Sequence, residues 1–190
     1  MIKNIILDVG GILFDDSKQN IEKILGKKCD IIYKNAYGKG FNECLLGEKT
    51  IKEYINSLTN LKDFESINYI LDRKNLRKTY PLIRENFDYI KNLKQKGYRL
   101  YLLTNITEES YIYINEIINI DMCFDGGIYS YREHLIKPNQ YIYKLMIDKY
   151  ELNKEETIFF DDKIKNVEAA KKVGINAFVF ESVDDIKNNL

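Results

Sequence analysis

The sequence has little of what marks several specialised protein classes. Its three cysteines are widely spaced and odd in number, which fits neither a disulfide framework nor a paired metal or redox motif. Basic and acidic residues both number 29, so there is no broad charge excess for binding nucleic acid or a membrane. The apolar run before Asp8 is too short for a signal peptide, and no stretch approaches a membrane span. We therefore expect a cytoplasmic protein without nucleic-acid or membrane partners.

Short apolar runs alternate with segments of helical spacing along most of the chain. At 190 residues the chain is long enough for one core, or for a core that carries a smaller insertion. Strands are predicted at residues 2–7, 99–103, 124–129, 157–160 and 177–180, and helices around residues 87–94, 111–118, 142–149 and 164–173. This alternation predicts a doubly wound, mostly parallel, Rossmann-like α/β sheet with right-handed crossovers.

Residues 15–81 interrupt this alternation because they are mostly of helical pattern and contain no convincing strand. Thr50 and Glu53 have the spacing of a capping box, so a helix is expected to begin there. We predict that residues 1–14 and 82–190 form the core. Residues 15–81 are predicted to form a helical cap inserted after the first strand.

Polar residues follow the predicted strands at the points where the strands end. Asp8 follows the first strand, Thr104 and Asn105 follow the second, and Asp161 and Asp162 follow the fourth. Lys137 comes several residues after the third. Ligands of open α/β sheets collect at the carboxyl ends of the strands, so these residues are expected to converge. Taken singly, each has an ordinary explanation as a turn or a helix cap, but their joint occurrence in this order favours a site.

The predicted cluster has the chemistry of phosphoryl transfer. A carboxylate such as Asp8 can attack phosphorus and form an aspartyl phosphate, provided that the negative charges are neutralised. Mg²⁺ and the ammonium of Lys137 would do this, and Asp161 with Asp162 would supply the hard oxygen ligands that Mg²⁺ prefers. The Thr104 hydroxyl and the backbone amides of residues 9–11 are expected to hold the phosphate oxygens.

These motifs resemble the four ordered motifs of the haloacid dehalogenase superfamily. They are Asp8-Val9-Gly10-Gly11 after a hydrophobic strand, Leu103-Thr104-Asn105, Lys137-Pro138, and Phe159-Phe160-Asp161-Asp162 with Asn166. The helical insertion resembles the C1 cap of the subfamily that includes phosphoglycolate phosphatases. Within it, the chain is most similar to bacterial phosphatases of the α-D-glucose-1-phosphate type, whose first motif also carries glycine.

The resemblance implies a role for each of these residues. It makes Asp8 the nucleophile and Lys137 its catalytic partner. The implied Mg²⁺ ligands are Asp8, the backbone carbonyl of Gly10, Asp161 and Asp162. The implied substrate-binding residues are Gly11, Thr104, Asn105 and Lys137. Asn166 would support the loop of the fourth motif.

Gly10 departs from the family pattern, which usually has an acid-base aspartate at this position. Another acid could replace it, with Asp15 and Asp16 as candidates, or the substrate could carry a better leaving group such as an anomeric phosphate. The sequence therefore predicts a Mg²⁺-dependent phosphatase for a small phosphorylated metabolite, with an anomeric sugar phosphate favoured. The alternative is a catalytically weak or silent protein on the same scaffold that binds a phosphorylated ligand.

Overall fold

One parallel sheet organises the computed structural model, which describes all residues from 1 to 190. Its order is β3-β2-β1-β4-β5, and every neighbouring pair of strands is parallel. The strands are β1 (Asn4–Leu7), β2 (Arg99–Thr104), β3 (Gly126–Tyr129), β4 (Thr157–Asp161) and β5 (Asn176–Val179). The predicted α/β fold is confirmed, with strand bounds that shift by a few residues.

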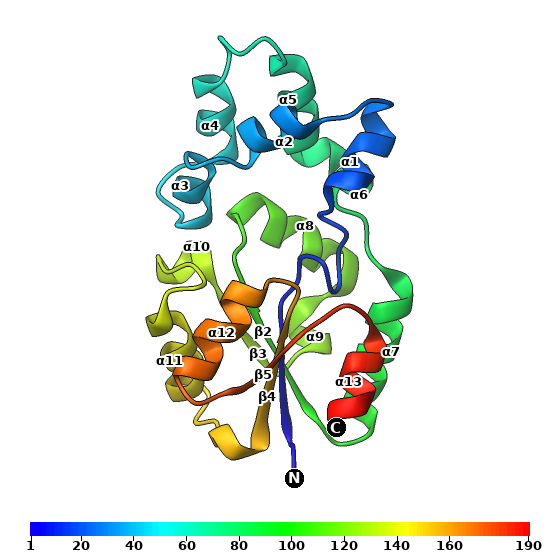
Figure 1. The fold of residues 1–190 in the computed structure, drawn as a ribbon, viewed down its shortest axis with the longest axis vertical. Coiled ribbons are helices and arrows are strands. Elements are labelled where there is room, and N and C mark those ends of the chain that lie inside the picture. Colours follow the sequence, from blue (N-terminus) through cyan, green and yellow to red (C-terminus); the bar gives the residue numbers. More distant parts are fainter.

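Both faces of the sheet are buried under helices. Successive side chains of a strand point to opposite faces, so each strand contributes to two apolar clusters. In β1, Ile5 and Leu7 belong to one apolar cluster and Ile6 belongs to the other. The helices on the first face are α7 (Arg84–Gln95), α8 (Glu108–Ile118), α9 (Ile120–Cys123) and α13 (Val183–Asn189). Those on the second are α11 (Gln140–Lys149) and α12 (Ile164–Lys172), and Figure 1 shows the two groups flanking the strands.

Short elements complete the region around the sheet. Helix α10 (Ser130–Glu133) follows β3, and the 3-10 turn η2 (Lys154–Glu156) precedes β4. None of the helices combines the length and the apolar content needed to cross a bilayer.

The segment between β1 and α7 is helical and has an apolar cluster of its own. It contains α1 (Lys18–Leu25), α2 (Asp30–Ala36), α3 (Phe41–Leu45), α4 (Ile51–Ser57), α5 (Phe64–Leu71), η1 (Arg73–Asn75) and α6 (Leu76–Thr79). All ten buried members of its cluster lie between Ile21 and Leu71. The capping box at Thr50 is present, because the Thr50 hydroxyl accepts from the Glu53 amide and the Glu53 carboxylate accepts from the Thr50 amide.

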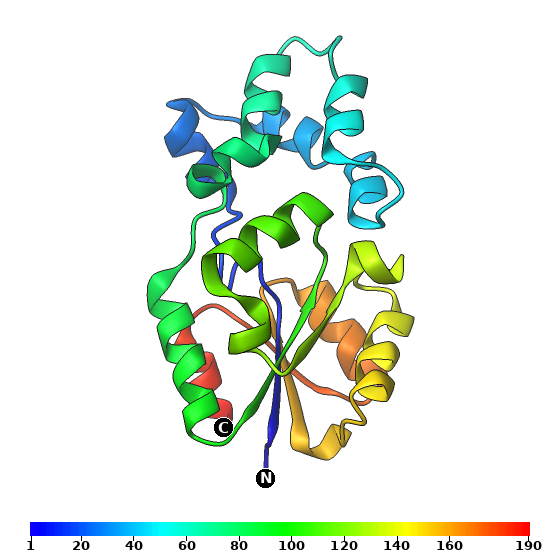
Figure 2. The same ribbon diagram turned by 180° about the vertical axis from the view of Figure 1, so that it is seen from behind.

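Two adjacent stretches of chain connect the helical segment to the sheet. Phe14 and Leu82 form an antiparallel bridge, and the Asp15 amide donates to the Pro81 carbonyl at 2.9 Å. The helical segment lies beyond the carboxyl ends of the strands, at the opposite end of the molecule from the N-terminus (Figures 1 and 2). The strand ends therefore face these helices. We call the contact region between the helical segment and the rest of the chain the seam.

Candidate functional site

The ends of β1, β2 and β4 lie side by side and bring the predicted polar residues together. Leu7 pairs with Leu102 on one side and with Phe160 on the other. Asp8 therefore emerges from the centre of the sheet directly beside Asp161. This is the point where the strand order reverses, so that connections leave in opposite directions and a crevice opens.

Lys137 lies at the centre of the cluster, with a side chain that is 0% exposed. Its ammonium donates to the Leu103 carbonyl at 2.8 Å and to Oδ2 of Asp161 at 2.6 Å, and it lies 2.9 Å from Oδ1 of Asp8. An ammonium has three donors, and here three oxygens surround it. The positive charge is therefore fixed in place beside Asp8.

Asp161 is buried, and both of its carboxylate oxygens accept hydrogen bonds. The Lys163 amide donates to Oδ1, and the Asn166 amide group donates to both oxygens at 2.9 and 3.0 Å. Burial alone would raise the pKa of Asp161, but Lys137 and these hydrogen bonds hold it below its ordinary value. Asp161 thus anchors Lys137 and the loop after β4. Asn166 supports this loop.

Asp162 differs from its neighbour because its buried Oδ1 atom has no hydrogen-bond partner. Burial raises its pKa. Carboxylate oxygens of Asp8, Asp161 and Asp162 lie within 4.8 Å of one another, which is close enough to share one ion. A buried acceptor without a donor is costly, and a hard divalent cation would satisfy it. The donor set therefore fits Mg²⁺.

The charge balance around the cluster is negative. The carboxylates of Asp8, Asp16, Asp161 and Asp162 are countered by the ammonium groups of Lys137 and Lys163. Nζ of Lys163 lies 3.7 Å from Asp162 and 3.8 Å from Asp16, so it faces both without a close hydrogen bond. Burial raises the pKa of Asp8 to about 6, and the opposing effect of the Lys137 charge is smaller. A divalent cation would restore neutrality.

Lys163 was not foreseen from the sequence. It follows the fourth motif directly and its side chain is partly exposed, so the only signal for it was its adjacency to Asp162.

The first motif forms a tight turn whose amides are partly used within the turn itself. The Gly11 amide, expected to hold a phosphate oxygen, donates to the Phe14 carbonyl at 2.8 Å, and the Val9 amide donates to Oδ1 of Asp8 at 2.7 Å. The Gly10 carbonyl takes part in no backbone hydrogen bond. A Cβ atom at Gly11 would lie 2.8 Å from the Asp162 carboxylate, so this turn packs directly against the fourth motif.

The second motif is at the site, but Asn105 is engaged with the lysine loop. Its amide group donates to the Lys137 carbonyl at 3.0 Å, and its side-chain oxygen accepts from the Lys137 amide at 2.8 Å. Asn105 therefore fixes the backbone of Lys137, a role that strand-end position alone did not indicate. Thr104 is 1% exposed at the end of β2.

Asp15 and Asp16, the candidates to replace the missing acid, have different surroundings. Oδ1 of Asp15 accepts from the Ser17 amide at 2.9 Å, in the turn that begins α1. The side chain of Asp16 instead extends over Gly10 and faces Lys163. Burial raises the pKa of Asp16, against the opposing charge of Lys163.

Comparison with known protein families identifies the family of this chain. The sequence model of the haloacid dehalogenase-like hydrolases matches residues 2–174, which is most of the chain. The chain belongs to this family. This is the family that the sequence motifs predicted, and two similar proteins bear phosphatase names.

Two characterised relatives and one solved structure illustrate the likeness of this haloacid dehalogenase-like hydrolase to known proteins. The sesquiterpene phosphatase astK of Aspergillus oryzae is 34% identical over 86 residues, covering 45% of this chain and 44% of that protein. The phosphorylated carbohydrates phosphatase of Thermotoga maritima is 24% identical, covering 96% of this chain and 88% of that one. The chain thus aligns with less than half of the first relative and most of the second.

The structural likeness extends over the whole molecule. A HAD family enzyme of Bacteroides thetaiotaomicron, solved as a magnesium complex, has a TM-score of 0.77 at 20% identity and covers 99% of this chain and 98% of that chain. At this identity the likeness shows the shared fold.

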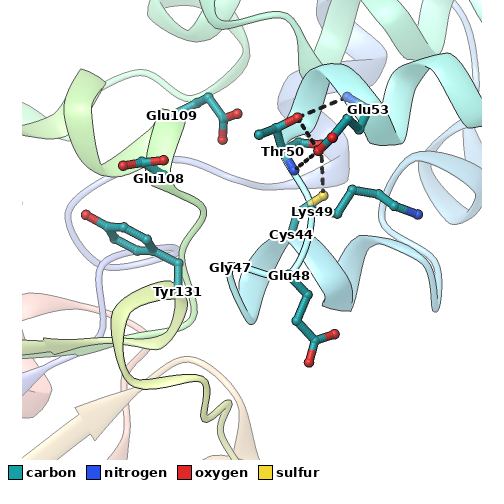
Figure 3. A pocket seen from close by; sticks show the side chains of 9 residues that line it. All are labelled: Cys44, Gly47, Glu48, Lys49, Thr50, Glu53, Glu108, Glu109 and Tyr131. Carbon is teal, nitrogen blue, oxygen red and sulfur yellow. Dashed lines mark hydrogen bonds between the residues drawn. The ribbon is translucent and has the colours of Figure 1, made fainter.

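A cavity of about 150 Å³ lies on the seam of this hydrolase. Figure 3 shows Glu108, Glu109 and Tyr131 from the sheet side facing the loop from Gly47 to Thr50. Glu109 accepts from the Ile51 amide at 2.9 Å, which joins α8 to the start of α4 across the seam.

A second contact crosses the seam at His134. Nδ1 of His134, after α10, lies 2.7 Å from the Leu46 carbonyl, so this ring nitrogen carries the proton of that contact. A Cβ atom at Gly47 would collide with the Tyr131 carbonyl. The helical segment therefore rests closely on the sheet region at this point.

Proposed function

We propose that this hydrolase is a Mg²⁺-dependent phosphatase that acts through an aspartyl-phosphate intermediate on Asp8. The observation that carries the proposal is the contrast around Lys137. Its buried ammonium is held by Asp161 beside the nucleophile, while the buried Oδ1 atom of Asp162 accepts no hydrogen bond. A fixed cation and an unsatisfied anion on either side of Asp8 are what phosphoryl transfer requires.

Four groups would hold the metal: the carboxylates of Asp8 and Asp162, the Gly10 carbonyl, and an oxygen of Asp161. When bound, Mg²⁺ supplies Lewis-acid polarisation of the phosphoryl oxygens and offsets the repulsion between them and Asp8. The magnesium complex of the similar Bacteroides thetaiotaomicron structure supports this choice of ion.

The side chains present prepare Asp8 for attack on phosphorus. Oδ1 of Asp8 is engaged by the Val9 amide and by Lys137, which leaves Oδ2 without a protein donor. The same ammonium would also stabilise negative charge on a phosphoryl group in the transition state. Thr104 is placed at the neighbouring strand end, where its hydroxyl would donate to a phosphate oxygen.

Residues 15–81 are proposed to act as a cap over the strand ends, of the C1 type that the sequence resembles. The two-stranded connection at Phe14 and Leu82 would serve as the hinge, and contacts such as Glu109 to Ile51 would form on closure. Closure would exclude water from the aspartyl phosphate until hydrolysis.

The proposed substrate is a small phosphorylated metabolite, with an anomeric sugar phosphate favoured. The Thermotoga maritima relative is named for phosphorylated carbohydrates, which supports this substrate class. Gly10 provides no acid at its own position, so without a substitute acid a leaving group that needs less protonation is favoured. The three buried free cysteines are consistent with the predicted cytoplasmic location.

The test is phosphate release from a panel of sugar and other small-molecule phosphates, with Mg²⁺ and with a chelator. The native chain is compared with Asp8→Asn and with Asp88→Asn, a control on the exposed face of α7. We expect metal-dependent turnover that only Asp8→Asn abolishes. No turnover by the native chain on any substrate would favour the alternative, a silent protein that binds a phosphorylated ligand.

A further inference from the structure

The space that a side chain at residue 10 would fill is already occupied. A Cβ atom built on Gly10 would lie 2.6 Å from Oδ2 of Asp16 and 3.1 Å from its carboxyl carbon. Standard bond lengths place the carboxylate oxygens of an aspartate about 2.4 Å from its own Cβ. An oxygen of Asp16 therefore lies about as far from this point as the oxygen of an aspartate at residue 10 would.

We propose that Asp16, which lies next to the hinge, is the general acid and base of the reaction. Its carboxylate takes the place of the one that Gly10 lacks. This inference rests on the proposed phosphatase function. It identifies a catalytic residue outside the four strand-end motifs, on the chain segment that leads into the helical cap.

The surroundings of Asp16 suit this task better than those of Asp15. Asp15 is committed to the turn before α1, through its bond to the Ser17 amide. No other residue donates a hydrogen bond to the Asp16 carboxylate, and Lys163 is 3.8 Å away. Its side chain is 39% exposed, which leaves an oxygen free to meet a substrate.

The backbone of Asp16 is held from the cap while its side chain reaches the core. The Tyr33 hydroxyl, from α2, donates to the Asp16 carbonyl at 3.0 Å. Tyr80 lies at the end of the cap segment, and its hydroxyl is 3.5 Å from the same Cβ position of Gly10. Placement of the acid therefore depends on how the cap sits. The chemical step becomes coupled to closure.

The proton transfers balance over the two half-reactions. In the first, Asp8 forms a bond to phosphorus, the bond from phosphorus to the leaving oxygen breaks, and protonated Asp16 gives its proton to that oxygen. In the second, the Asp16 carboxylate takes a proton from water as the water oxygen bonds to phosphorus. The bond between phosphorus and Asp8 then breaks, which releases phosphate and leaves Asp16 protonated for the next cycle.

The dependence of rate on the leaving group tests this role. With Mg²⁺ present, Asp16→Asn should lower kcat for the alkyl ester glycerol 2-phosphate by about 10²- to 10⁴-fold, the usual size of general acid-base help. For p-nitrophenyl phosphate, whose leaving group needs little protonation, the formation of the aspartyl phosphate should fall far less. Asp15→Asn is the matched control and should retain both activities.

Moving the carboxylate back to residue 10 gives a second, positive test. Gly10 is not in the left-handed region, so its backbone accepts a side chain once Asp16 no longer occupies the space. The double variant Gly10→Asp/Asp16→Ala should recover activity on glycerol 2-phosphate relative to Asp16→Ala alone. Gly10→Asp alone should gain nothing, because its Cβ meets the Asp16 carboxylate.

The outcomes separate this inference from the proposed function. If Asp8→Asn abolishes turnover but Asp16→Asn slows formation of the aspartyl phosphate equally from both substrates, or from neither, the phosphatase proposal stands and the role of Asp16 is wrong. A folded double variant that recovers nothing would also overturn it. If the native chain turns over neither of these esters nor any member of the sugar phosphate panel, both proposals fail together.

Discussion

The strand-end site and the seam differ in how firmly their polar groups are held. At the strand ends, Lys137 and Asp161 are buried, and each has several hydrogen-bond partners at 3.0 Å or less. On the seam, contacts such as Arg73 with Glu116 and His134 with Leu46 are single and exposed. The sheet thus fixes the chemistry, while the seam provides an adjustable surface. Substitutions in the two regions should accordingly affect different measurements.

The largest effect should come from the two adjacent carboxylates of the fourth motif. Asp161→Asn removes the main partner of buried Lys137 and should lower the free energy of unfolding by about 3 kcal/mol or more. Asp162→Asn removes a buried negative charge that accepts no hydrogen bond at Oδ1, so it should leave stability intact and raise the Mg²⁺ concentration needed for activity at least about tenfold. Denaturant unfolding and Mg²⁺ titration of activity measure the two effects. Equal effects of both variants would contradict this division of roles.

Removing the charge of the nucleophile should stabilise the metal-free protein. Because burial raises the pKa of Asp8 from 3.8 to about 6, the folded state binds this proton more tightly than the unfolded chain does. Its contribution is favourable at low pH and is lost as pH rises through about 6. Asp8→Asn should therefore raise stability at pH 8 on the order of 1 to 3 kcal/mol, and much less at pH 4.

Thermal unfolding in chelator at the two pH values measures this difference. Saturating Mg²⁺ should shrink the advantage of Asp8→Asn, because the ion stabilises the native carboxylate. A variant less stable than the native chain at pH 8 in chelator would show that the Lys137 ion pair outweighs the burial of Asp8.

A smaller effect is expected at the seam, where two glycines of the helical segment offer a matched pair. Gly26 and Gly47 both have left-handed backbones, with φ of 65° and 70°. Alanine at either should cost about 1–2 kcal/mol. Only Gly47→Ala places a Cβ against the Tyr131 carbonyl, whereas Gly26 has nothing within 4 Å. Gly47→Ala alone should therefore raise KM, and a similar change in Gly26→Ala would remove the argument for closure at this contact.

The smallest effect concerns the exposed ion pair between Arg73 and Glu116. Such pairs contribute at most about 1 kcal/mol, so Arg73→Ala should change the free energy of unfolding by less than that. The difference in kcat/KM between the native protein and Arg73→Ala should shrink as the salt concentration rises, because salt screens the pair in the native protein. A loss of several kcal/mol would mean that the seam is as firmly held as the strand ends.

The sheet could be predicted because its determinants are local and repeated. Apolar runs such as Thr157–Phe160 must be buried on both faces, so they were visible as strands without any knowledge of their partners. The last helix, α13, was missed although Ser182 and Asp185 form a capping box at its start. Its single buried residue, Ile186, gives too weak an apolar pattern to identify a helix.

The site was predictable in its residues and less so in their contacts. Positions at strand ends converge by topology, so Asp8, Lys137 and Asp161 could be grouped in advance. The engagement of Asn105 with the Lys137 backbone and the approach of Lys163 depend on loop conformations, which spacing does not determine. The sequence likewise left Asp15 and Asp16 equivalent, and the structure separates them by the turn at Ser17 and by the position of the Asp16 carboxylate over Gly10.

The most direct test of the central claim is to capture the covalent intermediate. The native protein is acid-quenched during turnover of p-nitrophenyl phosphate with Mg²⁺, and its peptides are analysed by mass spectrometry. We predict one phosphoryl group on the peptide that contains Asp8, absent in Asp8→Asn and absent when chelator replaces Mg²⁺. Turnover without phosphorylated Asp8 under conditions that trap the intermediate, or phosphorylation of another residue, would contradict the assignment of Asp8 as the nucleophile.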